Sequence, residues 1–162
     1  IVDTGAGISD SVLEFLVASG EVLLVTTPEP TSITDSYSLL KALYRHPRFQ
    51  DDFTKVKMVA NRVGNIKEGQ VLFDKLNAVV TRYLKIPMTY LGCVPQDPQV
   101  MQAVMQQIPV SIQNPGAKSS QAYQRIAERL CEKEEDQQPR RGMAAFFSHI
   151  IGTRNGAMKQ SK

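Results

Sequence analysis

Four short polar segments contain the residues of this 162-residue sequence that could do chemistry: residues 3–7, 26–30, 61–62 and 95–97. In the first of them, Asp3 precedes a turn that contains Gly5 and Gly7. An acid at the tip of a strand before a Gly-rich turn is how nucleotide switches hold magnesium and bring a backbone N–H to a γ-phosphate. Asp and Gly are also common in ordinary turns. On spacing alone, both interpretations stay open.

Each polar segment follows an apolar run that predicts a β-strand. Ile1 and Val2 are typical of the last residues of a buried strand. Residues 21–27 contain an unbroken apolar run, which predicts a strand buried on both faces of a parallel sheet. Residues 56–63 and 88–94 have the same strand character. The four polar segments therefore lie where we expect these strands to end.

Helical patterns separate the predicted strands. The first helix is expected after Asp10 or Ser11 and before Gly20, and the second between a cap at Thr31 or Ser32 and residue 46. Residues 66–84, a segment after residue 98 and residues 119–131 follow the same spacing. In the last of these helices the expected inward stripe is Tyr123, Ile126, Ala127 and Leu130. The alternation predicts a doubly wound α/β fold with a mainly parallel sheet and flanking helices. In such sheets ligands bind at the carboxyl ends of the strands.

Composition limits the class of protein. With 42% hydrophobic and 22% charged residues, the sequence is typical of one globular domain, and it contains no apolar run long enough to span a membrane. We therefore expect a cytoplasmic location. Cys93 and Cys131 form no C-x-x-C pair, which favours two free thiols over a zinc site or a disulfide. His46 and His149 lie away from the predicted strand ends and are assigned no catalytic role.

The C-terminal segment differs from the body in charge and pattern. Five basic residues and no acidic residue follow Pro139, so residues 1–139 have a net charge of −2 against +3 for the whole sequence. We expect a body at residues 1–131, a linker at 132–142 and a basic amphipathic tail at 143–162. The apolar stripe of the tail follows helical spacing and consists of Met143, Phe146, Phe147, Ile150 and Ile151.

This tail suits an anionic membrane surface. The flanking Arg140 and Arg141 would each add roughly 1 kcal/mol of attraction near an anionic leaflet. Two alternatives remain: the stripe docks on the protein's own sheet, or it docks a partner protein.

Two segments carry a resemblance to a known family. Asp3-Thr4-Gly5-Ala6-Gly7-Ile8 resembles the Walker B and switch II segment of MinD/ParA-type P-loop ATPases. Residues 25–35, followed by Tyr37 and by Leu39-Leu40-Lys41, resemble the flagellar-number branch of that family, known as FlhG, FleN or YlxH. The resemblance covers the chain from Ile1 to about Cys131.

The resemblance implies ATP and Mg²⁺ as ligands and ATP hydrolysis as the activity of the whole family member. Asp3 would bind Mg²⁺ through water, and Gly7 would sense the γ-phosphate. Asn61 would hydrogen-bond the adenine edge, and Arg62 would stack on the base or border it. The loop formed by Pro95, Gln96 and Asp97 would close over it.

The resemblance also implies how the protein is regulated. It implies an ATP-bound homodimer, reversible binding to the inner face of the cell membrane, and a flagellar GTPase or flagellar regulator as partner. Control of flagellar number or placement would be the biological function.

One element of the family pattern is absent from this sequence. No G-x-x-x-x-G-K-[ST] motif or lysine-rich variant occurs in it, so we expect an incomplete P-loop fold, no ATP hydrolysis by residues 1–162 alone, an open sheet edge and uncovered apolar faces. Two other functions stay open: a non-catalytic partner-binding module and a ParA-like DNA-segregation ATPase. The charge of −2 over residues 1–139 argues against a broad DNA-binding face, and we expect no sequence-specific nucleic-acid binding.

Overall fold

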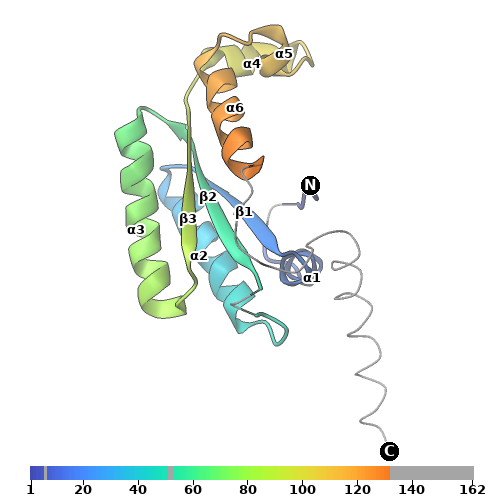
Figure 1. Cartoon of the computed structure of the whole chain (residues 1–162), viewed down its shortest axis with the longest axis vertical. Helices are drawn as coiled ribbons and strands as arrows, with labels where there is room; N and C mark the ends of the chain where they lie inside the picture. The colour runs from blue at the N-terminus through green and yellow to red at the C-terminus, as the bar shows by residue number, and fades with distance from the viewer. Residues whose placement is uncertain (6, 51–52, 132–162) are drawn as a thin grey trace, which may run out of the picture.

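The fold is a three-stranded parallel sheet with helices on both faces (Figure 1). The computed structural model describes residues 1–5, 7–50 and 53–131. Strands β1 (Glu21–Thr26), β2 (Lys55–Val63) and β3 (Met88–Pro95) lie side by side in chain order. The helices are α1 (Asp10–Ala18), α2 (Pro30–Arg45), α3 (Ile66–Leu84), α4 (Pro98–Met105), α5 (Val110–Gln113) and α6 (Lys118–Cys131). The predicted α/β fold with a parallel sheet is confirmed.

The two faces of the sheet are covered by different helices. Helices α2 and α3 pack on one face, where Val56 and Met58 of β2 contact the buried side chains of Leu40 and Leu76. Helix α6 packs on the other face, where Ala122 and Ile126 cover Val59, Leu91 and Val94. Helix α1 rests on α2 through Leu13, Val17 and Leu43. Coverage of both faces is the doubly wound arrangement.

Helix α3 lies unusually close to the sheet. The Asn65 side chain accepts a hydrogen bond from Glu68 N at 3.0 Å and so caps the first turn. A Cβ added to Gly69 would lie 2.6 Å from Tyr90 Oη and 2.8 Å from Cys93 Cβ. Glycine is therefore required for α3 to approach β3 this closely.

The prediction for the first two strands needs correction. Ile1 and Val2 are exposed and form no strand, because two residues without a neighbouring strand cannot maintain a hydrogen-bond ladder. In β1 only alternate residues are buried, so the expectation of burial on both faces is wrong. Leu23 and Val25 are 44% and 53% exposed, because no described element covers them on the face opposite α2. This matches the expected uncovered apolar face.

Details of the helices also differ from expectation. Helix α2 begins at Pro30, with Glu29 as its N-cap and Thr31 and Ser32 inside it. Helix α1 is preceded by Ser9, not by Asp10 or Ser11. In α6, Ala122 replaces Ala127 in the buried stripe, and Tyr123 is 40% exposed. Both cysteines are free, as predicted.

The linker and the basic tail lie outside the described residues. The boundaries at 131, 132–142 and 143–162, and the stripe from Met143 to Ile151 with Arg140 and Arg141, therefore stay predictions. Within the described part of the chain, no helix is both long and apolar enough to cross a bilayer.

Candidate functional site

A pocket of about 350 Å³ opens at the carboxyl ends of β2 and β3. It brings together Asn61 and Arg62 from β2 with Pro95, Gln96 and Asp97 from the end of β3, all five predicted from the sequence to contact the base. The remaining lining residues are Val94, Pro98, Val100, Met101 and Tyr123. The pocket therefore has one polar wall and a largely apolar remainder, the usual make-up of a small-molecule site.

An irregularity in β2 positions the polar wall. The register between β2 and β3 shifts between Asn61 and Val63, and Arg62 between them has the left-handed φ of 56°. Arg62 N donates to Asn61 Oδ1 at 3.0 Å. A β-bulge of this kind turns a side chain out of the regular alternation. A left-handed backbone at a residue other than glycine carries a cost, and such residues are concentrated at functional sites.

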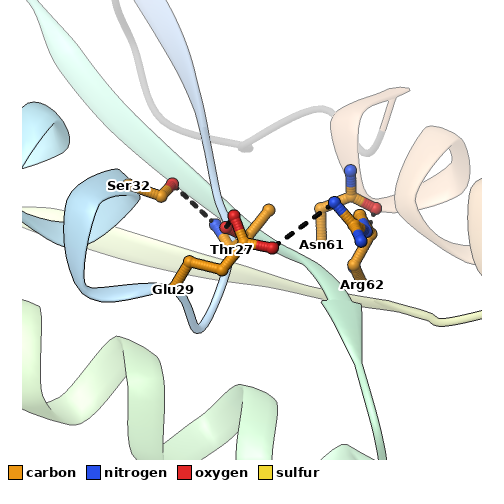
Figure 2. Close-up of polar contacts among 5 residues, drawn as sticks. All are labelled: Thr27, Glu29, Ser32, Asn61 and Arg62. Atoms are coloured by element: carbon orange, nitrogen blue, oxygen red, sulfur yellow. Dashed lines mark hydrogen bonds and ion pairs between the residues drawn. The ribbon is translucent and has the colours of Figure 1, made fainter.

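An ion pair connects the loop that follows β1 to the end of β2 at the carboxyl edge of the sheet. Glu29 Oε1 lies 3.4 Å from Arg62 Nη1, and Glu29 Oε2 accepts a hydrogen bond from Thr27 Oγ1 at 3.3 Å (Figure 2). Thr27 N in turn donates to Ser32 Oγ at 3.0 Å, so Ser32 orders this loop from inside α2 (Figure 2). The Glu29 and Arg62 side chains are 56% and 60% exposed. An ion pair this exposed contributes roughly 0–1 kcal/mol, so Arg62 can exchange Glu29 for a ligand at little cost.

Asp97 joins two helices at the rim of the pocket. Its Oδ1 accepts from Gln99 N at 3.0 Å, which caps α4. Its Oδ2 accepts from Ser119 N at 3.1 Å and from Ser119 Oγ at 2.9 Å, in the first turn of α6. The hydrogen bonds from Gln99 N and from Ser119 hold the pKa of the Asp97 carboxyl below its usual value. Both oxygens are thus used to position α4 and α6 around the pocket.

Asp3 and Gly7 lie on a separate segment that leads into α1, and neither lines the pocket. Both are exposed, and a Cβ added to Gly7, which has φ of +111°, would meet no atom within 4 Å. Among the residues that the structure describes, no group of three or more His, Cys, Asp or Glu side chains is arranged to hold a metal ion. The proposed magnesium role of Asp3 and the proposed γ-phosphate role of Gly7 stay predictions.

The described residues therefore fit the base of a nucleotide better than its phosphates. Asn61 supplies amide donors and an acceptor, the pairing groups of an adenine edge. Arg62 is the one cation among the residues that line the pocket, and no phosphate-binding loop is described beside it.

Sequence reasoning missed five residues of the pocket wall, Val94, Pro98, Val100, Met101 and Tyr123. Val100 and Met101 were predicted as part of a helix without a binding role, and Tyr123 was placed in the core stripe of α6. Met101 and Tyr123 are 61% and 40% exposed. Their position depends on how α6 packs on β3 and on how Asp97 joins α4 to α6, which helical spacing does not reveal.

Comparison with known proteins identifies similar chains. The chain is 38% identical over 151 residues to the antiactivator FleN of Pseudomonas aeruginosa, covering 93% of this chain and 52% of that protein. It is 30% identical over 155 residues to the flagellum site-determining protein YlxH of Helicobacter pylori, covering 93% and 51% respectively. The septum site-determining protein MinD of Bacillus subtilis is 25% identical over 162 residues, covering 96% and 56%. The resemblance predicted from the sequence motifs is confirmed.

Solved structures show the same fold. The septum site-determining protein MinD of Pyrococcus horikoshii, solved with Mg-ADP, superposes with a TM-score of 0.50 at 22% identity over 70% of this chain and 42% of that one. The cell division ATPase MinD of Pyrococcus furiosus gives 0.50 at 23% identity over 70% and 43%. No family model matches the chain. The chain spans about half the length of the curated relatives it matches.

Proposed function

Since the chain is a relative of the MinD-type proteins of the flagellar-number branch, we propose that it carries the base-binding part of a regulatory ATPase that controls flagellar number or placement. One observation supports this proposal most strongly. Five residues from the ends of two strands, predicted from the sequence to contact adenine, line a single pocket. A pocket at the carboxyl edge of a parallel sheet is where nucleotides bind in such folds.

In this proposal the pocket holds the adenine of ATP. The Asn61 amide bonds the base edge, and Arg62 leaves its exposed pair with Glu29 to border the ring. Pro95 and Gln96 form the rim, while Asp97 holds the rim in place through α4 and α6. Asp3 would bind Mg²⁺ through water, and Gly7 would contact the γ-phosphate. ATP and Mg²⁺ are the proposed cofactors.

The proposed output is a change in assembly and location. ATP binding would favour a homodimer, which places two tails on one assembly and raises their avidity for an anionic membrane by roughly 10²-fold or more. The proposed location is the cytoplasm, peripherally at the inner face of the cell membrane. A flagellar GTPase or a flagellar regulator is the proposed partner.

The test of the base site is ATP binding by the natural full-length protein with Asn61→Ala. Loss of a bidentate amide contact to a base is worth roughly 1–3 kcal/mol, so the Kd for ATP should rise about 5- to 150-fold in calorimetry. Asn77→Ala is the matched control, because Asn77 lies on α3 away from the pocket and hydrogen-bonds only Thr81 among the described contacts. Unchanged ATP affinity in the Asn61 variant, or a wild-type protein that binds no adenine nucleotide, would overturn the proposal.

A second test concerns hydrolysis by residues 1–162 alone. This sequence contains no G-x-x-x-x-G-K-[ST] motif, so we expect no ATP turnover when phosphate release is measured with Mg²⁺. Magnesium-dependent turnover by the purified chain would contradict that expectation.

A further inference from the structure

Tyr123 is the one aromatic side chain among the residues that line the pocket. It lies on α6, whereas the base-contacting residues predicted from the sequence lie on β2 and at the end of β3. Its neighbour Ala122 is 1% exposed and packs in the core under α6, while Tyr123 is 40% exposed. Successive residues of a helix point about 100° apart, so burial of Ala122 leaves Tyr123 on another face of α6, where it lines the pocket. The ring is therefore not part of the core.

Helix α6 is held at both ends, which fixes the position of this ring. In its first turn, Ser119 donates through N and Oγ to Asp97. In its last turn, Arg129 Nη1 donates to the Leu91 carbonyl of β3. Between these two anchors, Ile126 packs against Val59 and Leu91. A side chain on a helix anchored in this way is pre-organised, so little conformational entropy is lost when a ligand binds it.

The other surfaces of the pocket suit a flat, largely apolar ligand with one polar edge. Val94, Val100 and Met101 supply aliphatic and thioether surface. Asn61 supplies the polar groups, and Arg62 the cation. Aromatic side chains stack on nucleobases regardless of base identity, because every base has a π face.

Resting on the proposed nucleotide function, we propose that Tyr123 is the stacking residue for the base, so that α6 forms one wall of the nucleotide site. Asn61 then hydrogen-bonds the edge of the base, while the Tyr123 ring stacks on its face. The nucleotide thereby touches α6, which is the last helix before residue 132. Binding at the base would reach the C-terminal part of the chain directly through this helix.

The experiment compares Tyr123→Leu with Tyr123→Phe in the natural full-length protein. Loss of base stacking should raise the Kd for ATP about 5- to 100-fold in the Leu variant, and retention of the ring should keep the Phe variant within about twofold of wild type. Tyr83→Leu is the matched control, because Tyr83 is 60% exposed on α3, away from the pocket. Thermal unfolding midpoints of all variants should stay close to that of wild type.

A ligand that has no base distinguishes stacking by Tyr123 from a merely structural role of this residue. Inorganic tripolyphosphate should inhibit ATP binding with the same inhibition constant in wild type and in Tyr123→Leu, because it cannot stack. Tyr123→Trp adds a tryptophan to residues 1–162, which contain none, and the fluorescence difference between this variant and wild type should be quenched by ATP and not by tripolyphosphate.

The outcomes separate the two proposals. If wild type binds ATP and Asn61→Ala weakens binding while Tyr123→Leu leaves it unchanged, the stacking role is wrong and the base site stands. If wild type binds no adenine nucleotide, the proposed function fails. If Tyr123→Leu weakens the binding of tripolyphosphate as much as the binding of ATP, Tyr123 acts through the structure of the protein and not by contact with the base.

Discussion

At the residue scale, Asp97 shows how the hydrogen bonds of one side chain can shape a pocket. From the sequence it belonged to a loop expected to close over the base. In the structure its two carboxylate oxygens accept three hydrogen bonds, from Gln99 N and from Ser119 N and Oγ. Asp97 therefore joins the first turns of α4 and α6, the two helices that supply Met101 and Tyr123 to the pocket. Its position at a predicted strand end and the family resemblance assigned Asp97 to the site, while only the fold reveals its positioning role.

The lowered pKa of Asp97 predicts how stability depends on pH. Because the carboxyl has a lower pKa in the folded protein than its ordinary 3.8, its hydrogen bonds stabilise the fold fully above that value. This contribution is lost as the pH falls below 3.8 through the folded-state pKa. Asp97→Asn should lower the thermal midpoint at pH 7, and the difference from wild type should shrink below pH 3.8.

The control for this prediction is Asp35→Asn, an exposed position on α2. Circular dichroism melts of this variant should follow wild type across the same pH series. A gap between wild type and Asp97→Asn that is constant with pH would show that the charge of Asp97 is not the cause.

At the element scale, hydrophobic periodicity predicted where the helices and strands lie in the sequence. It did not predict which elements pack against one another. Helix α3 at Ile66–Leu84 matches the predicted 66–84, and β2 and β3 match within one residue at each end. Periodicity reports which residues of one segment share a face, and here that signal is strong. It does not report which helix covers which face. For this reason the outward position of Tyr123 was missed.

The close approach of α3 to the sheet gives a prediction at this scale. Gly69→Ala gains roughly 1 kcal/mol of helix propensity but places a methyl group against Tyr90 Oη and Cys93 Cβ. Overpacking of this kind costs about 1–3 kcal/mol, so we expect a net loss of up to roughly 2 kcal/mol in the free energy of unfolding by urea denaturation.

Two further variants test that cause. Tyr90→Phe in the Gly69→Ala background removes the nearer contact and should recover part of the loss. Gly116→Ala, whose Cβ would meet only Asn114 Oδ1 at an ordinary 3.5 Å, should be close to neutral. Full stability of Gly69→Ala would mean that α3 can move away from β3 without cost.

At the scale of the whole molecule, the proposed nucleotide site and the proposed membrane tail occupy different parts of the sequence. The residues of the site precede residue 131, and the tail follows it. The described body contains the pocket, and the tail at 143–162 lies outside the described residues. If α6 forms one wall of the base site, it is the element through which the pocket can affect the tail. The charge separation in the sequence, −2 over residues 1–139 and five basic residues after Pro139, predicted this division of roles.

The membrane role is tested by Phe146→Glu together with Phe147→Glu in the full-length protein. Each substitution replaces apolar burial, worth roughly 1.5–3 kcal/mol when complete, with a charge repelled by anionic lipid. Binding to vesicles of mixed zwitterionic and anionic lipid should fall more than tenfold in sedimentation, with the thermal midpoint unchanged. Ser148→Glu with His149→Glu adds the same charge off the stripe and should reduce binding much less. Equal losses in the two double variants would mean that charge, and not insertion of the stripe, governs binding.

The order of the three strands has a consequence for how the protein is made. Because β1, β2 and β3 lie side by side in the order in which they are translated, each new strand can pair with the one made just before it. Helices α2 and α3 emerge between the strands and can cover their face as synthesis proceeds. The other face must wait for α6, so Val59, Leu91 and Val94 stay open to solvent until residues 118–131 have left the ribosome. During that interval the nascent chain exposes apolar surface of the kind that chaperones bind.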